Sequence, residues 1–365
     1  MNTRLVEIFP RKNYTVDATE IIDLNLSDPI SQLLVIAEPD SNNTGVDNVI
    51  GHPVRCLEKI ELVDGSDVLY SLNGAQAQGV DFYHNWKVPF NDIRFINNYS
   101  IVVARLNFGR YLFDSDFALD PARHNNLQLK IKLDIDGGAD HSDDLYLSVL
   151  GQVFDQKVIA AKGLLTTKEL KQYTLVASSH EYTDLPTDAI YKQLFLRAQA
   201  YLYAPSTQID TIKLSEDQDK KIPINGLSMD QLIQSIVDTY GEYEESILVP
   251  AQSTDPFYYF CTPTEKNRFN ATEWRQSCQD STASCFFGDG GKFSFDPSAV
   301  NRNYQIRARG FIPHGVIPLL PDFSNDVADW YDVANLRSLR IDVKGGAALL
   351  ASSVAEIIAQ QLRMY

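Results

Sequence analysis

Ile60-Glu-Leu-Val-Asp-Gly-Ser-Asp-Val-Leu-Tyr-Ser-Leu-Asn-Gly74 returns 152 residues later, without a gap, as Ile212-Lys-Leu-Ser-Glu-Asp-Gln-Asp-Lys-Lys-Ile-Pro-Ile-Asn-Gly226. Five of the fifteen aligned positions are identical, including the Asn-Gly that closes each stretch. One match of this kind can arise by chance, so further matches in the same order are needed to establish a repeat.

Two further blocks align in the same order. Residues 132–138 match residues 340–346, and residues 149–154 match residues 357–362, both at an offset of 208. A sparser match at an offset of 206 sets four residues of the first half against four of the second: Gly109, Phe113, Asp116 and Phe117 against Gly315, Leu319, Asp322 and Phe323. Because the offset grows from 152 to 208, the second half carries about 56 extra residues, most of them after Gly226. The sequence therefore predicts a tandem duplication with one long insertion.

The composition is that of a folded protein with more than one core. The chain has 365 residues, of which 44% are hydrophobic and 22% charged. A single hydrophobic core stops growing at about 250–300 residues, so two domains are expected. The duplication predicts the same number.

The charge balance argues against direct binding to a genome. Lys and Arg number 32 and Asp and Glu number 48, which gives a net charge of -16. Such a surface repels phosphate and lacks the counterion release that drives non-specific nucleic-acid binding. The sequence contains no run of 18 apolar residues, and its first ten residues lack the apolar core of a signal peptide, so synthesis in a cytosol is expected.

Short β-rich runs separated by Gly, Pro, Asn and Asp fill both halves. The clearest is residues 127–135, where apolar and polar side chains alternate as in a half-buried strand. Residues 60–72 indicate a hairpin around Asp64-Gly65, because Asp-Gly tolerates the positive φ values of a tight turn. Residues 75–84 and 227–237 follow with a helical period. The pattern predicts an all-β fold of two tandem sandwiches of about eight strands, each with a short helix.

The expected division of the chain is residues 1–160 for the first sandwich with an extended N-terminal arm, 161–188 for a linker, and 189–365 for the second sandwich, with the insertion at about 243–303. Thr166-Thr-Lys-Glu169 has the pattern of a capping box and predicts a short helix to Tyr173 inside the linker. The last run fits a helical period, yet a repeated fold should end its halves alike, so a strand from about Val354 is favoured.

The cysteines are few and lack C-x-x-C spacing. Three of the four lie in the insertion, where they could form a local disulfide or a metal clip: Cys56 stands apart from Cys261, Cys278 and Cys285. Buried or indifferent thiols in a reducing cell are the favoured interpretation.

No catalytic, cofactor or metal site is predicted. The six histidines are scattered singly, at His52, His84, His124, His141, His180 and His314. A duplicated β-fold enzyme of the cupin kind would need clustered metal ligands. Nucleophile-elbow, phosphate-loop and dinucleotide motifs are absent from the sequence, and Gly288-Asp-Gly-Gly291 indicates a turn. An acidic group could hold calcium, but its spacing differs from the EF-hand pattern and a solvated loop is favoured: Asp134, Asp136, Asp140, Asp143 and Asp144.

The predicted chain resembles the double jelly-roll major capsid proteins of icosahedral viruses. The resemblance lies in the two tandem sandwiches, the helix after the hairpin in each, the one long insertion and the lack of a catalytic set of residues. The resemblance covers the whole chain, and it carries over no individual functional residue. It implies two eight-stranded jelly rolls and a non-enzymatic homotrimer, made in the host cytoplasm, that forms pseudo-hexagonal tiles of a viral shell. The implied partners are neighbouring capsomers, penton or spike proteins and, in many members, an internal membrane. The insertion is implied to form an outward tower.

Two other functions stay open at this point. A tandem carbohydrate- or protein-binding module of the adhesin or spike kind would use the aromatic residues of the insertion, such as residues 257–260 and Trp274, to stack on sugar rings. An enzyme without a recognisable site ranks third.

Overall fold

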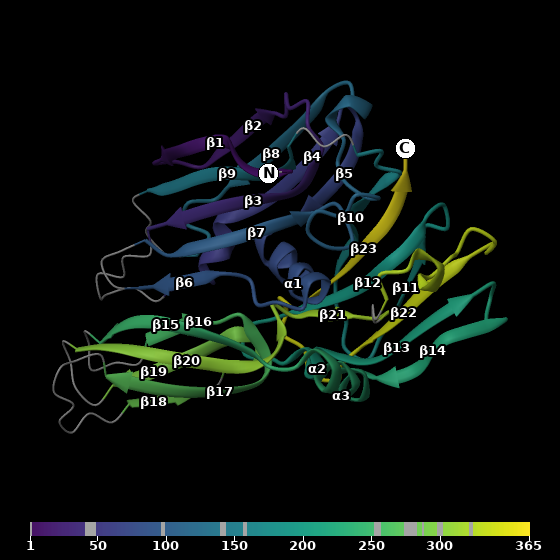
Figure 1. Ribbon diagram of the computed structural model, residues 1–365. Coiled ribbons are helices and arrows are strands. Elements are labelled where there is room, and N and C mark those ends of the chain that lie inside the picture. The colour runs from purple at the N-terminus through teal and green to yellow at the C-terminus, as the bar shows by residue number, and fades with distance from the viewer. Residues whose placement is uncertain are drawn as a thin grey trace.

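The computed structural model describes residues 2–40, 49–95, 99–138, 144–155, 159–251, 257–273, 283–286, 288–297, 302–320 and 324–365. Its strands form four sheets, two of which are large and run through both halves of the chain (Figure 1). The first large sheet has the order β1 (Thr3–Tyr14), β9 (Leu145–Phe154), β3 (Ile30–Pro39), β7 (Ile101–Asn107), β6 (Asn91–Arg94), β15 (Tyr243–Ala251), β20 (Arg302–Pro313), β17 (Pro263–Glu273). The second has the order β2 (Ala18–Asp23), β8 (Leu127–Leu133), β4 (Leu57–Asp64), β5 (Asp67–Leu72), β10 (Gly163–Thr174), β23 (Val354–Met364), β12 (Ile190–Gln199), β21 (Val316–Pro318).

The two smaller sheets and the helices complete the fold. The four-stranded sheet has the order β11 (His180–Leu185), β22 (Leu339–Gly345), β13 (Ile209–Glu216), β14 (Lys221–Ser228), and the three-stranded sheet the order β16 (Phe257–Phe260), β19 (Lys292–Pro297), β18 (Ala283–Phe286). The α-helices are α1 (Gly74–Asn85), α2 (Pro205–Gln208) and α3 (Met229–Tyr240). Short 3-10 helices are η1 (Pro53–Cys56), η2 (Pro121–Arg123), η3 (Asp289–Gly291) and η4 (Val327–Asp329).

The same strand order occurs twice. In the first half β1-β9-β3-β7 and β2-β8-β4-β5 form the two sheets of a sandwich, and in the second half β10-β23-β12-β21 and β11-β22-β13-β14 do the same. In each half, the first, last, third and sixth of these eight strands make one sheet, and the second, seventh, fourth and fifth make the other. The predicted all-β duplication is confirmed.

A β-bulge recurs at the same place in both copies. In β3 a register shift immediately precedes Gln32, which pairs with Gln152 of β9. In β12 a register shift immediately precedes Gln193, which pairs with Gln360 of β23. The pairs place β9 and β23 at the predicted offset of 208, and they confirm that β23 is a strand rather than a helix.

Two of the sequence matches are out of register. Ile60 pairs with Ile131, whereas its counterpart Ile212 pairs with Val343, so β8 and β22 are related by an offset of 212 rather than 208. An error of four residues keeps inward and outward positions in phase, which is why the wrong alignment still matched apolar with apolar. The match at 206 is also wrong, because Gly109 follows β7 whereas Gly315 precedes β21.

The repeated hairpin contains a gap that the sequence alignment missed. Two residues connect β4 to β5, whereas residues 217–220 connect β13 to β14. The true counterpart of Asn73, the N-cap of α1, is therefore Ser228, the N-cap of α3, and each is followed three residues later by a glutamine that completes a capping box. Asn225 and Gly226 lie inside β14 instead.

The predicted linker and the N-terminal arm are wrong. Residues 163–174 form β10, which pairs with β23 along its length, and His180–Leu185 forms β11, so the second sandwich begins at Gly163. The capping-box pattern at Thr166 does not start a helix. Pairing with a distant strand overrides this weak local signal, and the β-branched threonines suit a strand. Thr3–Tyr14 is likewise a strand of the first sandwich, paired with β9.

The insertion lies between α3 and β21 and comprises β15 to β20. Its strand β15 pairs in parallel with β6, with Ile247 opposite Ile93, so the insertion lengthens a sheet of the first half (Figure 1). One apolar core runs through both sandwiches, and the insertion has a separate core to which Val49, Ile93 and Phe95 of the first half contribute. The insertion is thus held by both halves of the chain.

Candidate functional site: the buried joint between the two halves

Helix α1 forms the joint between the two halves and is buried on all sides. All residues of α1 except Asn85 are buried, although several of them are polar. Small residues let the second half approach closely: a Cβ atom built on Gly79 would lie 2.4 Å from Cγ2 of Val316. A helix buried all round must find apolar and polar partners on every side.

Aromatic contacts fix α1 to the second half. The ring of Tyr83 lies 4.9 Å from that of Tyr240 and 6.1 Å from that of Phe195. The ring of Phe82 lies 5.7 Å from that of Tyr243. Residues of β12, α3 and β15 therefore meet on a single turn of α1.

A buried carboxylate joins α1 to the first half. Asp81 accepts hydrogen bonds from Nη1 of Arg105, at 2.8 Å, and from Nδ2 of Asn107, at 2.9 Å, both on β7. Burial raises the pKa of Asp81 above its usual value, and the charge of Arg105 opposes that rise.

A second buried carboxylate, Glu356 of β23, stands at the other end of α1. Nη1 of Arg197 lies 2.7 Å from it, and Nε2 of Gln76 donates to it at 2.7 Å. Gln76 also donates to Glu169 of β10. Residues of both halves, among them Asn73, Arg197 and Glu356, line a cavity of about 310 Å³ here. This ion pair is nearly inaccessible to water, so its strength depends on the geometry of its neighbours.

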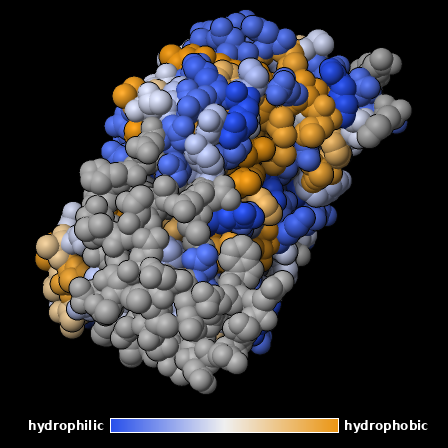
Figure 2. All heavy atoms as spheres, turned by 90° about the vertical axis from the view of Figure 1, so that its left-hand side faces the viewer, coloured by the Kyte–Doolittle hydropathy of each residue, from blue (hydrophilic) through white to orange (hydrophobic). Residues whose placement is uncertain are grey.

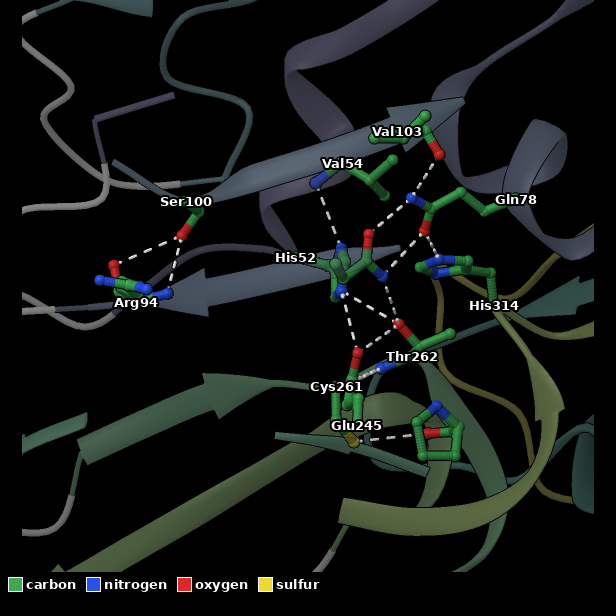
Figure 3. A network of polar contacts seen from close by, with 12 residues as sticks. His52, Val54, Gln78, Arg94, Ser100, Val103, Glu245, Cys261, Thr262 and His314 are labelled. Atoms are coloured by element: carbon green, nitrogen blue, oxygen red, sulfur yellow. Dashed lines mark hydrogen bonds and ion pairs between the residues drawn. The ribbon is translucent and has the colours of Figure 1, made fainter. Parts of the chain in front are cut away.

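A third polar cluster connects the first half to the insertion (Figure 3). Nε2 of His52 lies 3.1 Å from Oγ1 of Thr262, whose backbone and hydroxyl both donate to Glu245 of β15. Nε2 of His314 lies 2.9 Å from Oε1 of Gln78, and the rings of His52 and His314 lie edge to face at 4.8 Å. This pair could not be predicted from the sequence, because the two histidines are far apart in the chain and each stands alone.

The remaining histidines of the described residues have separate partners. His84 lies near Lys192 and Gln360, His124 near Asp64, and His180 near Asp342, while His141 lies outside the described residues. Burial lowers the pKa of His84 well below its ordinary value, and the charge of Lys192 lowers it further. Within the described part of the chain, no group of three or more His, Cys, Asp or Glu is placed to hold a metal ion.

Among the described residues, the predicted cysteine and acidic candidates do not gather into a site. Cys56 and Cys261 are buried free thiols and Cys285 is a partly buried one, and burial raises the pKa of each. Of the acidic loop, Asp144 accepts a hydrogen bond from Asn13, and Asp134 accepts one from the backbone of Asp136. Cys278, Asp140 and Asp143 lie outside the described residues. None of the described helices is long and apolar enough to cross a membrane.

Comparison with known proteins identifies the fold but no sequence relative. No protein-family model matches the chain, and no curated protein matches it. The STIV MCP, of Sulfolobus Turreted Icosahedral Virus, superposes with a TM-score of 0.61 at 11% identity, covering 100% of this chain and 97% of that one. The chain has the double jelly-roll fold.

Two further solved structures support this identification. The major capsid protein P2 from bacteriophage PM2 has a TM-score of 0.55 at 10% identity, with 100% of this chain and 98% of that one covered. PBCV-1 VP54 has a TM-score of 0.58 at 9% identity, with 99% and 94% covered. These neighbours confirm the predicted fold class of two tandem jelly rolls, with short helices and an insertion in the second.

Proposed function

We propose that this protein is the major capsid protein of a virus, a non-enzymatic component of the virion shell. The observation that supports this proposal is the match of both jelly rolls and the insertion, over the whole chain, to capsid proteins of three viruses. The finer proposal is a homotrimer whose six jelly rolls give a pseudo-hexagonal tile of an icosahedral shell. Its partners would be neighbouring tiles, with penton or spike proteins and an internal membrane as further candidates.

The outer face of the sheet β1-β9-β3-β7 in the first jelly roll supports self-association. The middle of strand β3 carries apolar residues on both sides: Leu33 and Val35 are fully buried in the core, whereas Leu34 and Ile36 on the opposite face are only partly buried. Leu150 of β9 pairs with Leu34. A water-facing side of an antiparallel sheet normally carries polar residues, so a second copy covering this face would explain its composition. On the side of the molecule in Figure 2, apolar side chains gather in a band beside polar ones.

The aromatic residues of the insertion disfavour the carbohydrate-binding alternative. Tyr259 and Phe260 are buried in the core of the insertion, and the ammonium of Lys292 lies over the ring of Tyr258 at 4.3 Å. Trp274 lies outside the described residues. Rings that stack on sugars must be open to solvent, so this segment serves packing instead.

Light scattering of the purified full chain tests the trimer. Three times 41.1 kDa is about 123 kDa. We expect this mass at micromolar concentration and moderate salt, and a hexagonal outline in electron micrographs. The double variant Leu34→Glu with Leu150→Glu should be a folded monomer, because two charges would be buried at each contact.

The matched control is Val16→Glu, at a turn residue with 68% of its surface exposed. This variant adds a charge without touching the proposed contact and should stay trimeric. A wild-type chain that remains at 41.1 kDa would contradict the trimer and favour a tandem binding module.

A further inference from the structure

The hydrogen bonds around His314 determine where its proton lies. The amide nitrogen of Gln78 donates to the carbonyl of Val103 at 3.0 Å and to Oδ1 of Asn91 at 2.7 Å, which leaves Oε1 of Gln78 as an acceptor. Nε2 of His314, at 2.9 Å from that oxygen, must therefore carry the hydrogen. Any second proton on this ring would have to sit on Nδ1.

His52 is fixed in the same tautomer by different partners. The backbone N–H of Val54 donates to Nδ1 of His52 at 3.1 Å, so this nitrogen carries a lone pair. The hydroxyl of Thr262 donates to Glu245 at 2.8 Å, and its oxygen therefore accepts from Nε2 of His52. Adding a proton to Nδ1 of His52 would break its hydrogen bond with Val54. This bond caps the N-terminus of η1.

The two rings are enclosed in the joint and lie close to charged side chains. Both histidines are only 4% exposed and their rings face each other at 4.8 Å. Glu245 lies 3.9 Å from Nε2 of His52, and Arg197, which donates to the carbonyl of His314 at 2.8 Å, opposes a positive charge on the His314 ring. Arg197 is itself paired with Glu356.

Two further titratable groups packed against this cluster, Tyr243 and Cys261, stay neutral, and the acidic groups Asp81 and Asp289 act on them from α1 and η3. Burial raises the pKa of the Tyr243 phenol and of the Cys261 thiol well above their ordinary values. Burial, followed by the charges of His52 and Arg197, lowers the pKa of His314 well below its ordinary value. The closed joint therefore binds fewer protons than an opened one, so its stability falls as the pH falls below the ordinary histidine pKa of about 6.5.

We propose that His52 and His314 form an acid-sensitive latch, which holds the insertion against the first jelly roll at neutral pH and releases it in mild acid. The latch joins the segment before η1, α1, β15 and the turn before β21, so its opening would free the base of the insertion from the first half. The proposal concerns the isolated chain and does not depend on the proposed capsid function.

Hydrogen exchange of the full chain at about pH 7 and about pH 5, corrected for intrinsic exchange rates, tests the latch. The reporters are peptides containing the amides of Val54 and Thr262, and the reference is a peptide of β8. Each histidine that is charged only in the opened form should lower protection by about tenfold per pH unit below its unfolded pKa. We therefore expect the reporters, and not the reference, to lose at least tenfold in protection.

The double variant His52→Gln with His314→Gln keeps a donor at each position but cannot take up a proton. Its reporters should show no selective loss, each single variant should show a part of it, and His180→Gln, a control at an exposed histidine paired with Asp342, should behave as the wild type. A wild-type chain without a selective loss would overturn the latch even if the double variant failed to fold. The same loss in a folded double variant would overturn it as well.

Discussion

Helices α1 and α3 are copies of one element, yet they have opposite surroundings. Both have twelve residues, a capping box and the same place after the hairpin of their jelly roll. In α3 the buried residues are Met229, Leu232, Ile233 and Ile236, which form one apolar side, whereas α1 is buried almost completely. One copy of the helix therefore lies at the surface, and the other forms the joint between the halves.

The difference shows how a polar helix is buried. The counterpart of Leu232 in α3 is Ala77 in α1, and the counterpart of Ile233 is Gln78. The smaller side chains of α1 let the second half approach closely, and Gln76, Gln78 and Asp81 each have a hydrogen-bond partner in a distant segment. Buried polar groups with complete hydrogen bonding specify one arrangement of their neighbours.

The largest expected effect comes from removing a charge beside α1. Arg197→Ala leaves the carboxylate of Glu356 buried without its cation, and losing one member of a buried pair costs about 3–5 kcal/mol. Chemical denaturation of the isolated protein measures this loss. The matched control is Arg340→Ala, which breaks the exposed pair with Asp184 and should cost far less stability. Equal losses would mean that the pair beside α1 is screened by water.

The two helices also differ in how much of them could be predicted from the sequence. The apolar spacing of Leu232, Ile233 and Ile236 predicts a surface helix, and α3 is one. For α1 the sequence predicts a helix but not its burial, because its polar residues look solvent-exposed until Arg105, Glu356 and His314 are brought to them. The partners lie in other strands, and single histidines or arginines carry no signal of pairing across a long chain.

The same limit explains the errors at the ends of the first jelly roll. The local capping pattern predicts a helix within residues 163–174. These residues instead form β10, because they pair with β23, which is almost two hundred residues away in the chain. Local patterns predicted the hairpins and strands that pair with their sequence neighbours. They could not predict pairings between the two halves, such as Ile247 with Ile93.

A second way to sharpen the comparison is to place an alanine at the same position of each helix. Gly79→Ala would place a carbon 2.4 Å from Val316, and overpacking of this kind costs about 1–3 kcal/mol. Gln234→Ala, at the exposed equivalent position of α3, should change the stability by less than about 0.5 kcal/mol. Thermal unfolding of both variants measures the difference. A stabilised Gly79→Ala protein would show that α1 can move away from β21.

The smallest expected effect concerns the two capping boxes, which pair an N-cap side chain, Asn73 or Ser228, with a glutamine three residues later but differ in exposure. The Asn73 side chain accepts from the backbone N–H of Gln76 at 2.8 Å, and the backbone N–H of Asn73 donates to the Gln76 side chain at 2.8 Å. The equivalent bonds between Ser228 and Gln231 are 3.2 and 3.3 Å long. Removing a cap costs about 0.5–2 kcal/mol. The loss for Asn73→Ala should be near the upper end of this range, because the backbone N–H of the fully buried Gln76 would lose its partner away from water. The loss for Ser228→Ala should be near the lower end, because water can replace the hydroxyl at the exposed Gln231. Denaturant titration of both variants decides: a Ser228→Ala loss equal to or larger than that of Asn73→Ala would mean that burial of α1 does not strengthen its cap, and that the packing of its side chains alone distinguishes the two helices.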